Sequence, residues 1–450
     1  MSDIRLERKI TLSGAVFLLL GNVIGASIFI LPGQLAGVAG PGVFIAYLIA
    51  GIPAVANCLI AAQIGSILPV SAAGYVFSSV VLHPFLGFLK EWTAALGLIV
   101  GVPILAYGFA DYMAFFLPEA DRIIIALSMV LVLLVINLLG IHTSIRVQMV
   151  LVSIFVISLL IFAVGGLFYI DTSLLSPVTP NGYGSILDAA VPAFYSYSGF
   201  ITLTAIGEEI KNPKKNIPLT LAITLFVVAT IYTLITLVLP GLIPWQELGS
   251  LAAPMSQASS LFLPGWFAIL ITVSALMAAA TSANVALIVM SRSFFALARH
   301  KIYPGWLATV SSRNNEPIPA LILVSALIIL GISLQGEIVQ YASATVIGLM
   351  FYGIVWAIGL IRLPTALPSH YQNAYFRLGK RTIWVVATIK ISISLIFLYV
   401  GVMNNLRPAT IYLCLVLLGA VYYILRNRHL ARSGISLKAI LRDEAHQKFE

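Results

Sequence analysis

Long apolar runs separated by short polar stretches recur along the whole 450-residue chain. Each run can cross ~30 Å of hydrocarbon as a helix of ~20 residues. No polar stretch between them is long enough for a soluble domain. The pattern predicts an all-α integral membrane protein with twelve transmembrane helices, at residues 12–35, 41–68, 85–117, 123–139, 147–168, 186–210, 218–239, 266–296, 318–334, 338–360, 384–402 and 409–425.

Positive charge is distributed unevenly between the two predicted sides. With the N-terminus inside, all but three of the 25 Lys and Arg residues fall on the cytoplasmic side. Arg122 and Arg407 fall outside, and Lys390 lies within a segment. Cytoplasmic loops are rich in Lys and Arg. We therefore expect a multi-pass protein of the plasma membrane (a bacterial or archaeal inner membrane), with cytoplasmic tails at 1–10 and 427–450 and no cleavable signal peptide.

Composition narrows the partners and cofactors. Hydrophobic residues make up 60% of the chain and charged residues 9%, whereas about a quarter of a soluble protein is charged. The net charge of +9 is explained by the inner loops and does not require nucleic acid. Cys58 and Cys414 lie in apolar runs and are expected to be free thiols, and no pair of histidines has metal-ligand spacing. The expected partners are the lipid bilayer and a small molecule, with no cofactor or metal, and the protein is a monomer or a homodimer.

Small polar residues interrupt two of the apolar segments at mid-membrane depth. Residues 21–29 read GNVIGASIF, and residues 192–200 read PAFYSYSGF. Unpaired backbone within hydrocarbon is tolerated only where it lines a cavity or is buried in protein. The sequence therefore predicts breaks in helices 1 and 6, near Gly25 and Ser198. A packing face for close helix contact is the alternative for either segment alone.

The spacing of the two interrupted segments predicts an internal symmetry. They lie five segments apart, an odd number, so two five-helix halves would enter the membrane from opposite sides, as in transporters built from inverted repeats. A broken helix offers free N–H groups at one half and free C=O groups at the other. A zwitterion fits this arrangement, with its carboxylate at the N–H groups and its ammonium at the carbonyls.

These residues resemble those of the amino acid–polyamine–organocation superfamily of permeases over nearly the whole chain. The run at 21–29 looks like the family's first-helix G-x-x-x-G-S-G-x-F, and 194–200 looks like its sixth-helix aromatic-Ser-aromatic-x-Gly stretch. The most specific match is GEEIKNPKKNIP at 207–218, which is similar to the family's E-x-x-N-P-x-[KR]-x-[IV]-P signature. The first- and fifth-helix runs look closest to the basic amino acid and polyamine exchangers. The resemblance implies a LeuT-like five-plus-five inverted-repeat core at 11–362 and two added helices at 382–426.

The chain departs from the family pattern at three places. The family's Gly-Ser-Gly is Gly25-Ala26-Ser27 here, so the hydroxyl has moved by one residue. Phe155 stands where many relatives carry a fifth-helix lysine, and Ile201 stands where an acidic residue often follows the sixth-helix glycine. The last two differences remove titratable groups from the core.

The candidate binding residues come from the two interrupted runs. Hydrogen bonding between helices is the alternative role for each single Ser or Tyr. The residues expected to bind substrate are Asn22, Val23, Ile24, Gly25, Ala26, Ser27, Ile28, Tyr195, Ser196, Tyr197, Ser198 and Gly199.

Five further residues are candidates for gates or an ion site. Phe200 is a candidate aromatic gate, and Glu208 and Glu209 form either a solvated charged face or, by the resemblance, an inner gate paired with Arg or Lys. Thr281 and Ser282 either hold neighbouring helices together or help to bind sodium.

Lys390 is expected to extend to the cytoplasmic face, with a partner inside the bundle as the alternative.

These features indicate a secondary active amino acid transporter rather than an enzyme. The sequence has neither H-E-x-x-H nor G-x-S-x-G. Two dissimilar broken helices in one chain fit a single-site carrier better than a channel, which needs a repeated filter or charge ring. Because the core lacks a fixed anion, we expect a neutral substrate. Because Phe155 and Ile201 replace the usual titratable positions, no proton carrier is evident and we favour exchange. The alternatives are proton- or sodium-coupled symport, or antiport of a basic amino acid and its amine.

Overall fold

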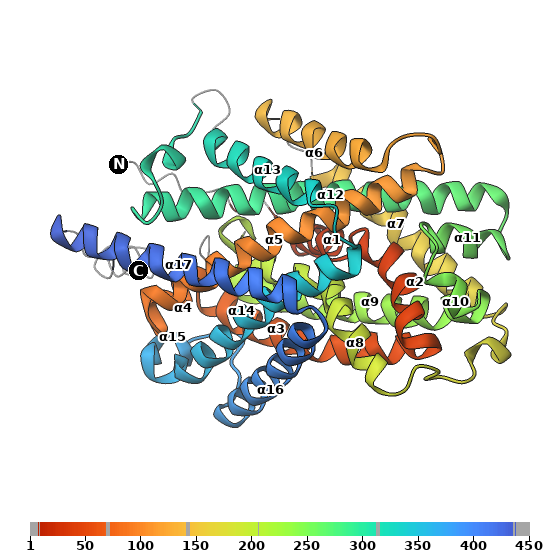
Figure 1. Cartoon of the computed structure of the whole chain (residues 1–450). Helices are drawn as coiled ribbons and strands as arrows, with labels where there is room; N and C mark the ends of the chain where they lie inside the picture. Colours follow the sequence, from red (N-terminus) through yellow and green to blue (C-terminus); the bar gives the residue numbers. More distant parts are fainter. Residues whose placement is uncertain are drawn as a thin grey trace.

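The computed structural model describes residues 8, 10–68, 73–140, 145–205, 207–311, 316–434 and 437, and within them the fold is helical (Figure 1). The α-helices are α1 Leu12–Val23, α2 Ser27–Ala39, α3 Val43–Ile67, α4 Ala73–Val81, α5 Pro84–Met113, α6 Arg122–Leu138, α7 Ile145–Gly166, α8 Gly184–Ala193, α9 Pro213–Leu242, α10 Trp245–Leu248, α11 Pro254–Ser260, α12 Gly265–Arg299, α13 Ile318–Ser333, α14 Ile338–Ala366, α15 Pro368–Gln372, α16 Lys380–Asn404 and α17 Leu406–Arg432. The 3₁₀ helices are η1 Gly40–Gly42, η2 Thr172–Leu175, η3 Phe194–Ala205, η4 Gly207–Glu209 and η5 Gly305–Ala308.

Eight helical stretches among the described residues are long and apolar enough to cross a membrane. Two further apolar helices, α6 and α13, are shorter. The first stretch, Leu12–Ile67, contains two of the predicted segments joined through η1. The predicted sixth segment is divided between α8 and η3. The eight stretches are Leu12–Ile67, Pro84–Met113, Val147–Gly166, Pro213–Leu242, Gly265–Arg299, Ile338–Ala366, Lys380–Asn404 and Leu406–Arg432.

The first predicted segment is interrupted where the sequence placed a break. Helix α1 ends at Val23 and α2 begins at Ser27. Ile24 has φ −80° and ψ 72°, and the Gly25 N–H donates to the Val23 carbonyl at 2.9 Å. These values describe an inverse γ-turn. The turn displaces the chain from the α-helical path, so that α2 starts with its own unpaired N–H groups.

The sixth segment is tightened rather than opened. Helix α8 ends at Ala193, and the chain continues as the 3₁₀ helix η3 over Phe194–Ala205. The expectation of an unwound chain near Ser198 is therefore corrected: these residues keep helical turns of a different pitch. Runs of 3₁₀ helix longer than three or four residues are uncommon, and mid-helix ones often mark hinges. The change of pitch alters which side chains face helices α1, α3 and α9.

The helices that carry these interrupted segments lie inside the bundle. Helix α1 packs against α7, α9, α12 and η3, and η3 packs against α3. Around them, α5 packs against α12 and α14, and α14 packs against α16.

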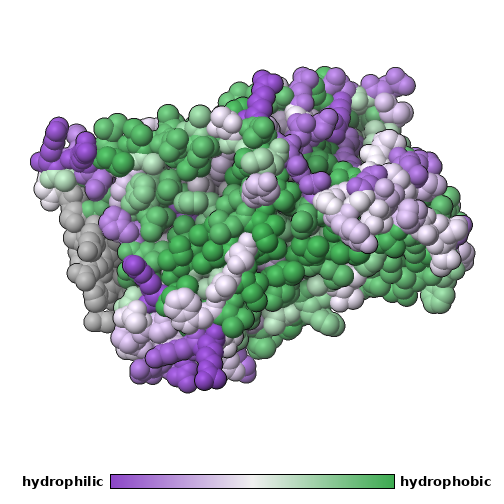
Figure 2. Space-filling model, turned by 60° about the horizontal axis from the view of Figure 1, so that its bottom comes forward, coloured by the Kyte–Doolittle hydropathy of each residue, from purple (hydrophilic) through white to green (hydrophobic). Residues whose placement is uncertain are grey.

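The outer helices present apolar side chains to the surroundings. Exposed residues on α17 include Leu413, Leu417, Leu418 and Leu425, and α6 and α7 expose similar rows. Figure 2 shows a broad hydrophobic area across one face, with hydrophilic residues gathered toward its margins. Contiguous apolar surface of this extent marks contact with lipid or another apolar partner. The protein is therefore built to sit in a membrane.

Among the residues that the structure describes, two lysines are completely buried within the helices. Lys90 on α5, which the sequence assigned to the cytoplasmic side, is 0% exposed, and its Nζ lies 2.8 Å from Glu91 Oε1 and 4.3 Å from the Tyr352 ring centre. Lys390 on α16 is also 0% exposed, so the expectation that it extends to the surface is wrong. Its Nζ lies 5.2 Å from the ring centre of Phe194 and has no hydrogen-bond partner among the described residues.

Glycine at position 353 makes room for Lys390. A Cβ at Gly353 would collide with Lys390 Cε and would lie 3.6 Å from Asn57 Oδ1. The Asn57 oxygen is likewise buried and has no hydrogen-bond partner among the described residues. Packing between α14 and α16 thus decides that the side chain stays inside the bundle.

Replacing each buried lysine by methionine is expected to affect stability differently at the two positions. Lys390→Met keeps the side-chain volume and removes a polar head without a partner, so the melting temperature should stay the same or rise. Lys90→Met leaves Glu91 without its cation, so we expect a loss on the order of 3 kcal/mol. Thermal unfolding of the detergent-solubilised variants measures both, and a large loss from Lys390→Met with none from Lys90→Met would contradict this account.

Candidate functional site

The start of α2 offers unpaired backbone donors in the core. Among the described residues, the N–H groups of Ala26, Ser27 and Ile28 donate to no acceptor, whereas Phe29 N–H already bonds the Ala26 carbonyl at 3.0 Å. Residues 23–28 are all buried, and Ile24 and Ile28 are 0% exposed. Such N–H groups at a helix start attract a negative charge, because the helix dipole adds to their own partial charge.

A tyrosine on α9 links the two interrupted segments. The Tyr232 hydroxyl lies 3.0 Å from the Val23 carbonyl oxygen and 3.1 Å from the Ser196 carbonyl oxygen, and its proton is shared between them. Tyr232 is 0% exposed. One side chain therefore satisfies a carbonyl at the end of α1 and another in η3. Both carbonyl groups belong to residues of the two interrupted runs, from which the candidate binding residues were taken.

Asn22 makes a second link between the same segments. Its Nδ2 donates to the Gly199 carbonyl at 3.0 Å and to Thr202 Oγ1 at 2.7 Å. A Cβ at Gly199 would lie 2.9 Å from Asn22 Nδ2 and Val23 Cγ2. Glycine is thus required there for α1 to approach η3. The Asn22 side chain therefore holds the two segments together. Ser198, next to Gly199 in η3, is partly exposed.

The predicted aromatic residues of η3 are anchored in the core. Tyr195 is 8% exposed and its hydroxyl donates to the Gly101 carbonyl at 2.8 Å. Tyr197 packs with Tyr47 and Tyr232, at ring-centre distances of 6.4 and 5.1 Å. Tyr47 OH lies 3.4 Å from Ser196 Oγ. This tyrosine cluster fixes one side of η3 against α3 and α9.

Ser282 brings α12 against the break, whereas Thr281 does not. Ser282 Oγ donates to the Gly21 carbonyl at 3.1 Å, and a Cβ at Gly25 would lie 2.9 Å from that oxygen. Thr281 Oγ1 donates within its own helix, to Met277 at 2.8 Å. Of the two candidate ion ligands, Ser282 alone is joined to the first segment by a hydrogen bond.

Of the predicted gate residues, Phe200 lies within the second interrupted segment, and Glu208 and Glu209 lie just beyond it in η4. Phe200 is 1% exposed in η3. Glu209 Oε1 lies 3.8 Å from Arg292 Nη1 on α12, while the Glu208 side chain is outside the described part of the structure. The Glu209 carbonyl accepts from Ile10 N–H at 3.0 Å, and Ile10 pairs with Ile210 as an isolated parallel bridge. The chain before α1 is therefore tied to the segment after η3.

Sequence reasoning missed three residues that organise the site: Tyr47, Thr202 and Tyr232. Each lies on a long apolar segment where one polar side chain predicts nothing by itself. A buried tyrosine nevertheless usually finds a hydrogen-bond partner, and that expectation is the only signal that could have selected Tyr232. Its two carbonyl partners are 209 and 36 positions away in the chain.

The described residues contain no group of three or more His, Cys, Asp or Glu able to hold a metal ion. Cys58 is buried and Cys414 exposed, and both are free thiols.

The helices with apolar outer faces, and a buried polar centre at two interrupted segments, define a helical membrane protein of the transporter class. The sequence matches the amino acid permease family over residues 10–429, and the chain belongs to that family. Its family and relatives are transporters and not enzymes.

Relatives extend this classification. The chain is 27% identical to the vacuolar cationic amino acid transporter 4 of Arabidopsis thaliana, over 72% of this chain and 58% of the relative. It is 27% identical to a branched-chain amino acid permease of Bacillus subtilis, over 70% of this chain and 72% of the relative. It is 28% identical to a methylthioribose transporter of the same bacterium, over 69% of this chain and 72% of the relative.

Proposed function

We propose that the chain carries a neutral amino acid across the plasma membrane by alternating access, exchanging one amino acid for another. In this proposal it crosses the membrane twelve times, as a five-plus-five inverted repeat followed by α16 and α17, with both termini inside. The placement of the interrupted segments five segments apart supports the repeat. The observation that carries the proposal is the row of unpaired N–H groups at Ala26, Ser27 and Ile28.

The substrate is oriented by its two charged ends. Its carboxylate accepts from the N–H groups of Ala26, Ser27 and Ile28, and its ammonium faces carbonyl groups near Asn22, Val23, Tyr195 and Ser198. The Val23 carbonyl already accepts from Tyr232. A carbonyl oxygen has two lone pairs and can accept a second donor. Because η3 and α1 are held by Asn22 and Tyr232, both ends of the ligand meet a single preformed unit.

The side chain of the proposed substrate is uncharged. The contacts of Asn22, Gly25, Ser196 and Tyr232 described above include no Asp or Glu. A second cation would therefore enter a low-dielectric site without a fixed anion, at a cost of several kcal/mol. Cation–π contact would offset about 2 kcal/mol. The ring of Trp356 on α14 lies 5.3 Å from Lys90 Nζ and therefore already faces a cation of the protein itself. The name of the branched-chain relative agrees with this proposal, and that of the cationic one does not.

Sodium symport is the second candidate. The contact between Ser282 Oγ and the Gly21 carbonyl places two oxygen atoms side by side across α12 and α1, and hard cations prefer oxygen ligands. Exchange is favoured because Thr281 is directed to carbonyls of its own helix and adds no third ligand.

A radiolabelled uptake panel in proteoliposomes tests the proposal. We expect uptake of leucine or alanine to need amino acid inside the vesicle and to be accelerated by it. An exchanger must bind an internal substrate before it can turn back to the outside. Uptake into empty vesicles that depends on sodium or a proton gradient would overturn exchange. Arginine or lysine outcompeting leucine and alanine would overturn the neutral substrate.

A further inference from the structure

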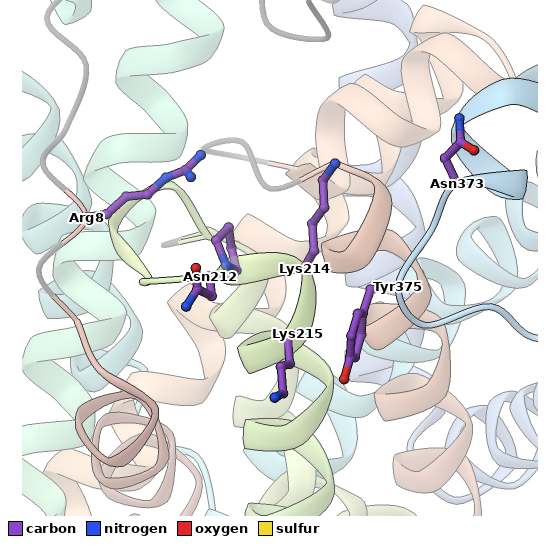
Figure 3. Close-up of a pocket in the computed structure, with 7 residues that line it drawn as sticks. Arg8, Asn212, Lys214, Lys215, Asn373 and Tyr375 are labelled. Carbon is purple, nitrogen blue, oxygen red and sulfur yellow. The ribbon is translucent and has the colours of Figure 1, made fainter.

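A basic cavity opens at the beginning of α9, away from the interrupted segments. It encloses about 430 Å³ and is lined by Arg8, Asn212, Pro213, Lys214, Lys215, Asn373 and Tyr375. Figure 3 shows that these side chains come from three separate parts of the chain: the segment before α1, the first turn of α9, and the loop between α15 and α16. The cavity therefore exists only in the folded protein.

The lining favours an anion. Three of its residues, Arg8, Lys214 and Lys215, are cations, and none has an ion pair with a described residue. No Asp or Glu is among the described lining residues. Asn212, Asn373 and Tyr375 add neutral hydrogen-bond donors. Arg, Lys and amide groups together match the several oxygen atoms of a phosphate group.

The side chain of Asn212 takes no part in the start of α9. Asn212 has φ 46° and ψ 55°, and its side chain does not cap α9. Its carbonyl accepts from the N–H groups of Lys215 and Asn216 at 3.1 and 2.9 Å, and Pro213 has no N–H. The Asn212 amide group is thus not used by the helix start and lies at the cavity.

An apolar stripe leads away from the cavity along α9. Leu219, Ile223 and Phe226 are 38%, 41% and 75% exposed, and they follow Lys215 at spacings of four, four and three residues. Residues at these spacings share one face of a helix. A cationic pocket one turn above an exposed apolar stripe has the two halves of a phospholipid site, whereas a soluble phosphate would need only the first.

We propose that this cavity binds the phosphate headgroup of an anionic membrane phospholipid, whose acyl chain lies along Leu219, Ile223 and Phe226. Basic pockets at the membrane surface are suited to such headgroups. The bound lipid joins the segment before α1 to α9 and to the loop before α16. Because Ile10 is paired with Ile210, next to the Glu209 to Arg292 contact, the lipid also stabilises the region of the predicted inner gate. The proposal does not depend on which substrate is carried.

The test measures lipid binding to the full chain in detergent by native mass spectrometry, with phosphatidylglycerol, phosphatidylcholine and inorganic phosphate as separate probes. The variant is the triple substitution Arg8→Gln/Lys214→Gln/Lys215→Gln. The matched control is Arg362→Gln/Arg428→Gln/Arg432→Gln, which removes three exposed cations outside the cavity. Thermal unfolding without added lipid checks that both variants fold.

We expect phosphatidylglycerol to bind in preference to phosphatidylcholine. The cavity variant should lose affinity for it by about fivefold per cation, on the order of 100-fold in all, and the control should lose far less. Equal loss in both triple variants would show only general charge attraction and would overturn the site. Inorganic phosphate that binds as tightly as the lipid and displaces it would overturn the lipid as the ligand. Because binding is measured without transport, failure here leaves the amino acid proposal standing.

Discussion

Replacing Gly25 by leucine is expected to abolish substrate binding. A Cβ at this position would lie 2.9 Å from Ser282 Oγ, 3.3 Å from Ser282 Cβ and 3.5 Å from Leu105 Cδ2. A leucine side chain would therefore force α12 away from the break or project into the space beside the free N–H groups of α2. Overpacking of this kind costs about 1–3 kcal/mol, and the loss of ligand space adds to it. We expect affinity to fall by on the order of 100-fold or more.

Equilibrium binding of radiolabelled leucine to the purified variant measures this effect. Gly265→Leu, at the start of α12, is the control, because a Cβ there meets nothing within 4 Å. It should bind as the unaltered protein does. If Gly25→Leu bound amino acid normally while remaining folded, the substrate site would lie elsewhere in the bundle.

Removing the hydroxyl of Tyr232 is expected to uncouple the two interrupted segments. In Tyr232→Phe the carbonyl groups of Val23 and Ser196 lose a donor that reaches both. Val23 keeps the N–H of Gly25. A buried carbonyl left without its partner costs about 1–3 kcal/mol, so the melting temperature should fall. The affinity for the substrate should also fall, by roughly tenfold or more, because the relative position of α1 and η3 defines the binding site.

The control for this variant is Tyr422→Phe. The Tyr422 hydroxyl also donates to one backbone carbonyl, that of Ile302 at 2.7 Å. This contact is made by α17, outside the helices that surround the break. Tyr422→Phe should lower the melting temperature without changing substrate affinity. Equal effects of the two variants on affinity would mean that Tyr232 acts only on stability, and its positioning role would be wrong.

The positions of the breaks could be predicted because they follow from local chemistry. Gly25 sits where apolar helix formers would be expected, and residues 24–26 are not helical. The kind of distortion could not be predicted in the sixth segment. Pro192 lies at the end of α8, but whether the following residues open or tighten depends on the partners they find. In the structure η3 is held by Asn22, Tyr232 and Gly101, which come from three other helices.

For Lys390, too, the sequence predicted the position but not the side-chain direction. Its depth in a predicted helix was evident from sequence, since it lies ten positions after Lys380, where α16 starts. The direction of its side chain was not evident from sequence, because a lysine at that depth can either reach the surface or stay inside the bundle. The space left by Gly353 on α14 and the ring of Phe194 keep the side chain of Lys390 inside the bundle.

The sequence by itself determined that this is a helical membrane protein of a transporter family, and where its helices are interrupted. Hydrophobic run length, the placement of Lys and Arg, and the residues of short motifs are local properties, and each is readable without knowledge of contacts. Only the tertiary structure decided which atoms join the two interrupted segments, why Gly199 and Gly25 must lack a side chain, and where the basic cavity forms. These features depend on residues far apart in sequence, and close packing among helices brings them together.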